Sequence, residues 1–123
     1  MRLRNADRAT VDRSKVVEYL LNTAHPDNGG KAQFFASLGF SVAEADALIA
    51  ALRVVGVAGT VVEHTTSEHG EKYVVDGVLA PHTGDRGQRA VRTIWIVDRG
   101  ADTPRLVTAY PGKEEGSRDD KGT

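Results

Sequence analysis

The stretch Ala90-Val91-Arg92-Thr93-Ile94-Trp95-Ile96-Val97 decides the fold class of this chain. It is rich in β-branched and aromatic residues, which favour strands. Successive side chains of a strand point to opposite sides, so the segment has two different faces. One face is formed by Val91, Thr93, Trp95 and Val97, and the other by Arg92, Ile94 and Ile96. The pattern predicts a central strand over 90–97.

Three other segments of the second half have the same character, and turn residues separate them. Strands are predicted over 57–65 and 71–79, joined by the turn Ser67-Glu68-His69-Gly70, and over 105–110, where Pro111 stops the last one. Strands joined by short turns pair in antiparallel fashion. The second half of the chain therefore predicts a roughly four-stranded antiparallel sheet.

The first half has helical periodicity instead. Helices are predicted over 14–22, over 30–38 and from Ser41 to Gly56, the third opened by the capping box Ser41-Val42-Ala43-Glu44. Helices followed by adjacent strands are typical of the α+β class. We therefore expect an α+β fold in which three N-terminal helices pack on a roughly four-stranded antiparallel sheet. The predicted helical side of the core consists of Leu20, Phe35, Leu48, Ile49 and Leu52.

Length and composition indicate one domain. The chain has 123 residues, and we expect an N-terminal arm over 1–13, a single α+β domain over 14–111 and a disordered charged tail over 112–123. The absence of cysteine excludes disulfides, thiolate zinc sites and cysteine nucleophiles. Neither a signal peptide nor an apolar run of membrane-spanning length is visible, so the predicted location is cytoplasmic, without a membrane partner.

The net charge of −1 gives no basic field over the whole protein, and therefore no strong non-specific attraction to nucleic acid. Positive charge is concentrated in two segments, 1–15 and 85–99. A locally basic surface remains possible there.

Two residues around the loop between the first two predicted helices could carry chemistry. His25 can act as a general acid or base near neutral pH, and Lys31 could hold a phosphate. On their chemistry alone, a surface histidine and a helix-start lysine are the simpler interpretation. His64 and His69 flank the predicted hairpin turn, but no carboxylate at ligand spacing completes a metal site there, so a solvated turn is favoured and no metal is predicted.

The central strand and the last strand carry the other candidates. Arg92 supplies a planar, permanently charged fork for a phosphate, or it extends from the sheet into solvent. Thr93 and Trp95 share the opposite face of this strand, and in the second interpretation Trp95 belongs to the core. Thr108 and Tyr110 lie on one face of the last strand, where their hydroxyls could line a pocket, or they are an ordinary strand residue and a rim aromatic.

Seven sequence blocks follow one another over residues 14–111. They are Tyr19-Leu20-Leu21, His25-Pro26, Lys31-Ala32-Gln33-Phe34-Phe35, Leu38-Gly39-Phe40, Gly70-Glu71-Lys72-Tyr73, Val91 to Val97, and Pro104 to Pro111. In this order the blocks resemble an uncharacterised bacterial domain family, which occurs as short stand-alone proteins or as the C-terminal tip of polymorphic toxins. Helices followed by a four-stranded sheet also resemble the architecture of barnase, colicin D, EndoU and RelE-type ribonucleases.

The resemblance implies a metal-independent endoribonuclease of toxin or stress-effector type, which cleaves RNA by attack of its own 2′-hydroxyl and needs no cofactor. The implied partners are RNA, either tRNA or mRNA, and a cognate antitoxin or immunity protein. The alternative is a non-catalytic protein-interaction module, such as a toxin–antitoxin partner or an accessory domain. The implied catalytic residues are His25, Lys31, Arg92 and Thr108, and the implied substrate-binding residues are Thr93, Trp95 and Tyr110.

Overall fold

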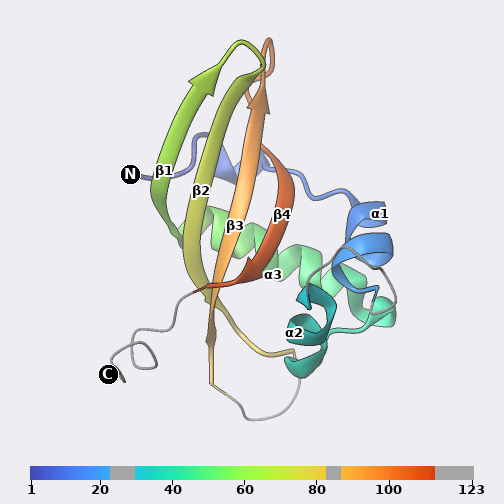
Figure 1. Cartoon of the computed structure of the whole chain (residues 1–123). Helices are drawn as coiled ribbons and strands as arrows, with labels where there is room; N and C mark the ends of the chain where they lie inside the picture. The colour runs from blue at the N-terminus through green and yellow to red at the C-terminus, as the bar shows by residue number, and fades with distance from the viewer. Residues whose placement is uncertain (23–29, 83–86, 113–123) are drawn as a thin grey trace.

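The computed structural model describes residues 1–22, 30–82 and 87–112 of the chain (Figure 1). The described part confirms the α+β class, with three α-helices and one four-stranded antiparallel sheet. The helical elements are η1 (Ala6–Arg8), α1 (Arg13–Lys15), η2 (Val16–Leu20), α2 (Lys31–Ser37), η3 (Val42–Glu44) and α3 (Ala45–Ala58). The strands are β1 (Thr60–Ser67), β2 (Gly70–Leu79), β3 (Arg89–Asp98) and β4 (Arg105–Pro111).

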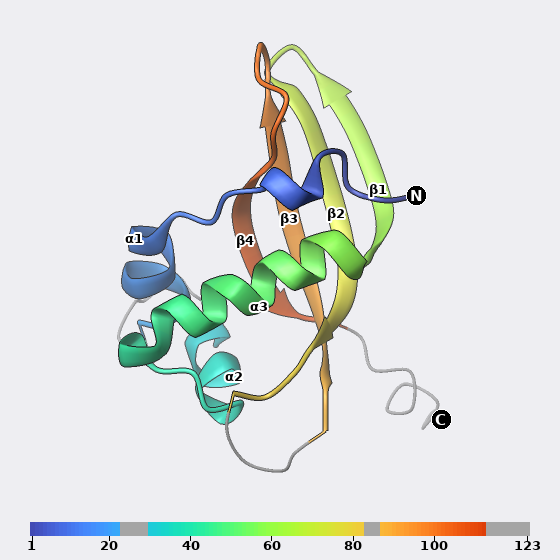
Figure 2. The same cartoon turned by 180° about the vertical axis from the view of Figure 1, so that it is seen from behind.

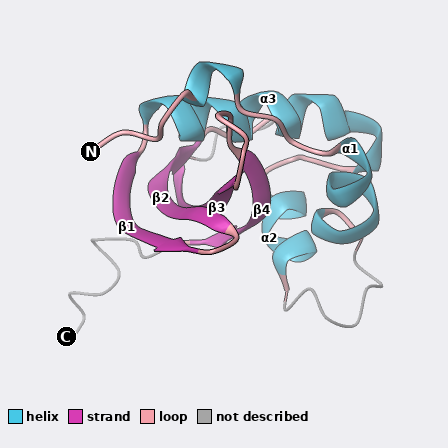
Figure 3. Ribbon diagram, turned by 90° about the horizontal axis from the view of Figure 1, so that it is seen from above, coloured by secondary structure: helices cyan, strands magenta, loops and turns pink. Residues whose placement is uncertain are grey.

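The sheet is a meander with the strand order β1-β2-β3-β4. Helix α3 crosses one face of it (Figure 2). Seen from above, the strands curve around the face that α3 covers, and α1 and α2 lie beyond β4 (Figure 3). We call the face toward α3 the inner face and the opposite one the outer face.

The two predicted faces of the central strand are confirmed. Val91, Thr93, Trp95 and Val97 are buried on the inner face, and the alternate residues on the outer face are half-buried. The buried polar side chains of Thr93 and Trp95 have hydrogen-bond partners within the core. The Thr93 hydroxyl donates to the carbonyl of Val75 at 2.9 Å and accepts from Trp95 Nε1 at 2.7 Å.

The helical side of the core is largely as predicted. Leu20, Phe35, Leu48 and Leu52 are fully buried, and Ile49 is partly buried against the same cluster. The apolar spacing therefore identified the correct face of α3.

The third helix begins as predicted and ends later than predicted. Ser41 and Glu44 form the capping box. The prediction that Gly56 ends the helix was wrong, since α3 continues to Ala58 and is followed by Gly59. Gly56 has another role: a Cβ at this position would lie 3.0 Å from Cζ2 of Trp95, so the missing side chain lets the indole pack against α3. The first strand consequently begins at Thr60 rather than at Val57.

The first predicted helix is two short elements. One α-helical turn, α1, is capped by the carboxylate of Asp12, which accepts from the backbone of Ser14 at 3.0 Å. The π-helical η2 follows, and the N–H of Leu21 reaches back to the carbonyl of Val16 at 2.8 Å.

The first residues of the chain pack on the domain. Leu3 and Ala9 belong to the core cluster. Thr10 pairs with the start of β4, donating to the carbonyl of Pro104 at 2.9 Å and accepting from the N–H of Leu106 at 3.0 Å. Of the segment predicted as a tail, Gly112 is described and donates to the carbonyl of Ala90 at 3.0 Å, and residues 113–123 lie outside the described residues. No helix in the described segments is long and apolar enough to cross a membrane.

Candidate functional site

An open cleft of 690 Å³ lies where the α1–η2 segment and the start of α2 meet β4. Below it is called the cleft. Its walls carry charges of both signs, from Asp12, Lys15, Glu18 and Lys31, so it is polar without being strongly basic. The residues that line it are Asp12, Ser14, Lys15, Glu18, Tyr19, Lys31, Val107 and Thr108.

Lys31 and Tyr19 form a polar contact in the cleft. Lys31 is the first residue of α2, directly after Gly30, whose left-handed φ of 87° turns the chain into the helix. Its Nζ donates to the Tyr19 hydroxyl at 2.7 Å and lies 4.8 Å from the centre of the Tyr19 ring. An ammonium group has three N–H donors. Tyr19 thus orients a cation that has further donors for an anion in the cleft.

Thr108 also lines the cleft. Its Oγ1 is buried, and it has no hydrogen-bond partner in the described part of the chain. A buried polar group without a partner costs about 1–3 kcal/mol.

Arg92 lies on the outer face, one strand inward from β4. Its Nε and Nη2 donate to the two carboxylate oxygens of Asp76 at 2.6 and 2.7 Å. Its cross-strand neighbour on β4 is Tyr110. The hydrogen bond to Asp76 raises the pKa of the Arg92 guanidinium, and Tyr110 adds to this, so the group stays charged at every physiological pH.

A hollow of 260 Å³ opens beside the guanidinium and is lined by Arg92, Tyr110, Pro111 and Gly112. Below it is called the hollow. Tyr110 connects it with the cleft, because Lys31 Nζ lies 6.0 Å from the centre of the Tyr110 ring. Lys31 and Thr108 therefore line one cavity, and Arg92 and Tyr110 line its neighbour.

The remaining predicted site residues lie elsewhere. Thr93 and Trp95 are completely buried between the sheet and α3 and line neither cavity. We leave them out of the candidate site, because a substrate could reach them only by opening the core. His25 lies outside the described residues, and its role stays a prediction from the sequence.

Two residues of the site were not identified from the sequence. Tyr19 stands in one of the recognised sequence blocks, but only the tertiary structure brings it against Lys31. Asp76 is an acidic residue within a strand of valines, and the register of the β2–β3 hairpin would have placed it opposite Arg92. An acidic residue in such a strand is a usable signal, because an unpaired charge is costly there.

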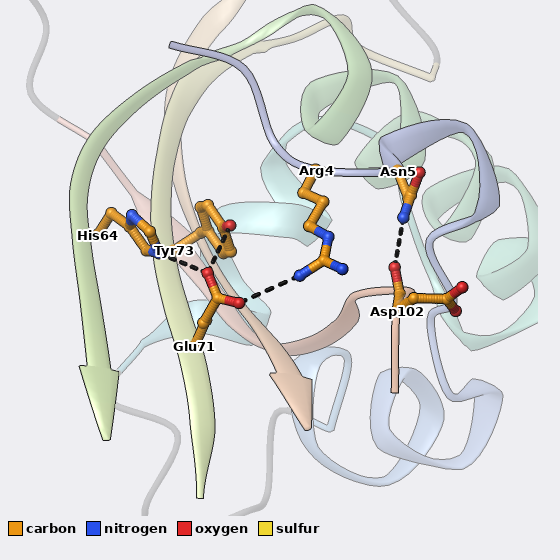
Figure 4. A network of polar contacts seen from close by, with 6 residues as sticks. All are labelled: Arg4, Asn5, His64, Glu71, Tyr73 and Asp102. Carbon is orange, nitrogen blue, oxygen red and sulfur yellow. Dashed lines mark hydrogen bonds and ion pairs between the residues drawn. The ribbon is translucent and has the colours of Figure 1, made fainter. Parts of the chain in front are cut away.

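A second polar cluster consists of Arg4, His64, Glu71 and Tyr73 (Figure 4). It lies near the tip of the β1–β2 hairpin, and none of its residues lines either cavity. One carboxylate oxygen of Glu71 accepts from His64 Nε2 at 2.8 Å and from the Tyr73 hydroxyl at 3.0 Å, and the other accepts from Arg4 at 3.1 Å. These contacts, with that of His64 the largest, lower the pKa of Glu71. The His64 ring also stacks on the Tyr73 ring, with centroids 4.3 Å apart. The cluster fastens the N-terminal segment to the sheet.

The two histidines of the hairpin do not form a joint site. His64 is engaged by Glu71, and His69 lies 3.6 Å from the carboxylate of Glu68 on the solvent side. Within the described segments, no group of three or more His, Cys, Asp or Glu side chains is placed to hold a metal ion.

The chain belongs to the DUF6883 family, a domain of unknown function whose family model matches residues 2–113. A chain of the contact-dependent growth inhibition toxin–immunity protein complex from Klebsiella pneumoniae 342 has a similar structure. The TM-score is 0.67 over 89% of this chain and 97% of that chain, at 14% sequence identity. At this identity the likeness establishes a shared fold. A comparison with curated proteins finds no match.

Proposed function

We propose that the protein is a metal-independent endoribonuclease of toxin or stress-effector type, which cleaves RNA by attack of the RNA's own 2′-hydroxyl. The observation that carries the proposal is the cleft, in which Lys31 is held by Tyr19 and the unpartnered Thr108 hydroxyl is buried. Cations, phenols and hydroxyls are groups that recognise a phosphodiester and its ribose.

The reaction needs these groups for charge and for position. The 2′-oxygen bonds to the adjacent phosphorus and the bond from phosphorus to the 5′-oxygen breaks, which leaves a 2′,3′-cyclic phosphate and a 5′-hydroxyl. A base takes the 2′-proton and an acid protonates the departing oxygen. We assign one of these two roles, general acid or general base, to His25 from the sequence. Lys31 and Arg92 stabilise the negative charge on the phosphorane-like transition state, and Thr108 orients the reacting hydroxyl.

The shared fold supports a toxin-related assignment. The structural neighbour belongs to a complex of a growth inhibition toxin with its immunity protein. By the same likeness, we expect the chain to have a cognate antitoxin or immunity protein.

Inducible expression in a bacterial host tests this function directly. We expect growth to stop on induction of the wild type, with fragments of tRNA or mRNA ending in 2′,3′-cyclic phosphate. Lys31→Met and His25→Ala should restore growth at equal protein level. Growth arrest without cyclic-phosphate ends would rule out the chemistry proposed.

A second candidate is a non-catalytic interaction module. It is favoured by the edge strand β1, which is mostly exposed, and by the exposed apolar side chains of Val54, Val57, Val62 and Val78. An edge strand can pair with an extended segment of a partner. This candidate predicts that the product of a neighbouring reading frame co-purifies with the chain and that Val62→Asp abolishes the association, with no RNA cleavage by the chain alone.

A further inference from the structure

The ring of Tyr110 lies near two cations that come from different elements. Lys31 from α2 approaches the ring to 6.0 Å from its centre, a distance at which a cation still interacts with an aromatic face. Arg92 is the cross-strand neighbour of Tyr110 and is held by Asp76. The sheet register and the start of α2 therefore bring both cations close to the same aromatic ring.

The hollow on the Arg92 side is built from flat groups. Its lining consists of a planar guanidinium, a phenol ring, a pyrrolidine ring and a residue without a side chain, namely Arg92, Tyr110, Pro111 and Gly112. Gly112 lies tight against β3, since a Cβ there would be 3.2 Å from the backbone of Val91. A cavity of 260 Å³ that is lined by planar groups fits a planar ligand better than a branched side chain.

A nucleic acid strand likewise holds each base close to a phosphate. Aromatic side chains and arginine planes bind unpaired bases by stacking, independently of base identity. We infer that the hollow binds one unpaired nucleobase of single-stranded RNA, stacked on Tyr110, while the scissile phosphate next to that base contacts Lys31 and Arg92. This inference rests on the proposed ribonuclease function and names the substrate class of the same site.

The geometry of stacking requires the bound RNA to be single-stranded. In an A-form duplex the bases are stacked inside the helix, and a protein reaches mainly phosphates and 2′-hydroxyls. A duplex could contact Lys31 but could not place a base in the hollow. The site therefore distinguishes single strands from duplexes through Tyr110 rather than through its charges.

Binding of an uncleavable probe tests the inference separately from catalysis. The probe is a fluorescein-labelled 2′-O-methyl oligoribonucleotide, which lacks the proton needed for self-attack, used alone or annealed to its complement. Fluorescence anisotropy with the wild type should show tighter binding of the single strand. Tyr110→Leu should weaken that binding about 5- to 150-fold, the measured range for loss of one base–aromatic stack. Tyr110→Phe, which keeps the ring, should bind within about twofold of the wild type.

Salt gives an independent readout. Neutralisation of phosphate on a single strand predicts that log K falls with log salt at a slope of about −0.7 per phosphate, and Lys31→Met should make the slope shallower. Equal binding of single strand and duplex, undetectable binding of both, or full binding by Tyr110→Leu would each overturn the inference. RNA cleavage that is unaffected in Tyr110→Leu would also overturn it, while leaving the ribonuclease proposal intact. Tyr110-dependent binding without cleavage of ordinary RNA would remove the ribonuclease proposal instead.

Discussion

Both carboxylate oxygens of Asp76 on β2 accept hydrogen bonds from Arg92 on β3, at 2.6 Å from Nε and 2.7 Å from Nη2. Such a two-point contact fixes the plane of the guanidinium as well as its position. The two residues are opposite each other in the β2–β3 register, so the sheet itself sets the pairing. Arg92 is therefore presented to Tyr110 and to the hollow in one orientation.

Asp76→Asn should reveal this positioning role. The variant keeps the size of the side chain but loses the charge-assisted contact, so the guanidinium is free to turn. We expect kcat for RNA cleavage to fall about tenfold, which corresponds to roughly 1.4 kcal/mol, with little change in KM. Because both side chains are more than a third exposed, stability should drop by no more than about 1 kcal/mol.

Two observations would contradict this role. One is unchanged kcat in Asp76→Asn. The other is a loss of activity that merely follows a loss of folded protein, measured by thermal melting. Asp76→Glu, which retains the carboxylate, should recover part of the activity.

Leu48→Ala should test the packing of α3 on the sheet. Leu48 is fully buried, so truncation leaves a cavity and should lower the free energy of unfolding by about 2–5 kcal/mol. Val54→Ala is the matched control on the same helix: Val54 is 62% exposed, and its truncation should cost no more than about 0.5 kcal/mol. Urea titration of both variants measures the difference, and equal midpoints would refute the assigned helix face.

The Glu71 cluster should make stability fall in acid. Its contacts lower the pKa of Glu71 in the folded protein below the ordinary value of 4.5. A group with a depressed folded pKa stabilises the fold above its unfolded pKa, and this contribution is lost as pH falls through the folded pKa. The wild type should therefore lose more stability than Glu71→Gln between about pH 5 and pH 3. Thermal melting across this range checks the prediction, and parallel curves would contradict it.

The sequence predicted those features that local periodicity encodes. The alternation from Val91 to Val97 identified the inner face of β3, and Ser41 with Glu44 identified the start of the third helix. Gly56 was wrongly predicted to end the third helix, because the role of this glycine depends on a contact distant in sequence. The missing side chain makes room for the ring of Trp95.

The candidate site could be predicted only in part. The sequence identified four residues of the site by the chemistry of their side chains, and the structure places them around two adjoining cavities. These residues are Lys31, Thr108, Arg92 and Tyr110. The contact of Tyr19 with Lys31 joins two elements across residues 23–29, and no local pattern encodes it. Thr93 and Trp95 were expected to bind substrate, but both are buried in the core. Alternation along the strand places them on one face, and it does not show whether that face lines a pocket or the core.

Cleavage of purified RNA in EDTA by the wild type, by Lys31→Met and by Lys72→Met tests the central claim most directly. Lys72 is the matched control, because it lies on β2 opposite Ile96 and lines neither cavity. We expect the wild type and Lys72→Met to produce fragments with 2′,3′-cyclic phosphate ends at similar rates. Lys31→Met should be slower by about 100-fold or more, since it loses a cation that acts on the transition state. No cleavage by the wild type at any salt concentration, or equal cleavage by all three proteins, would contradict the account.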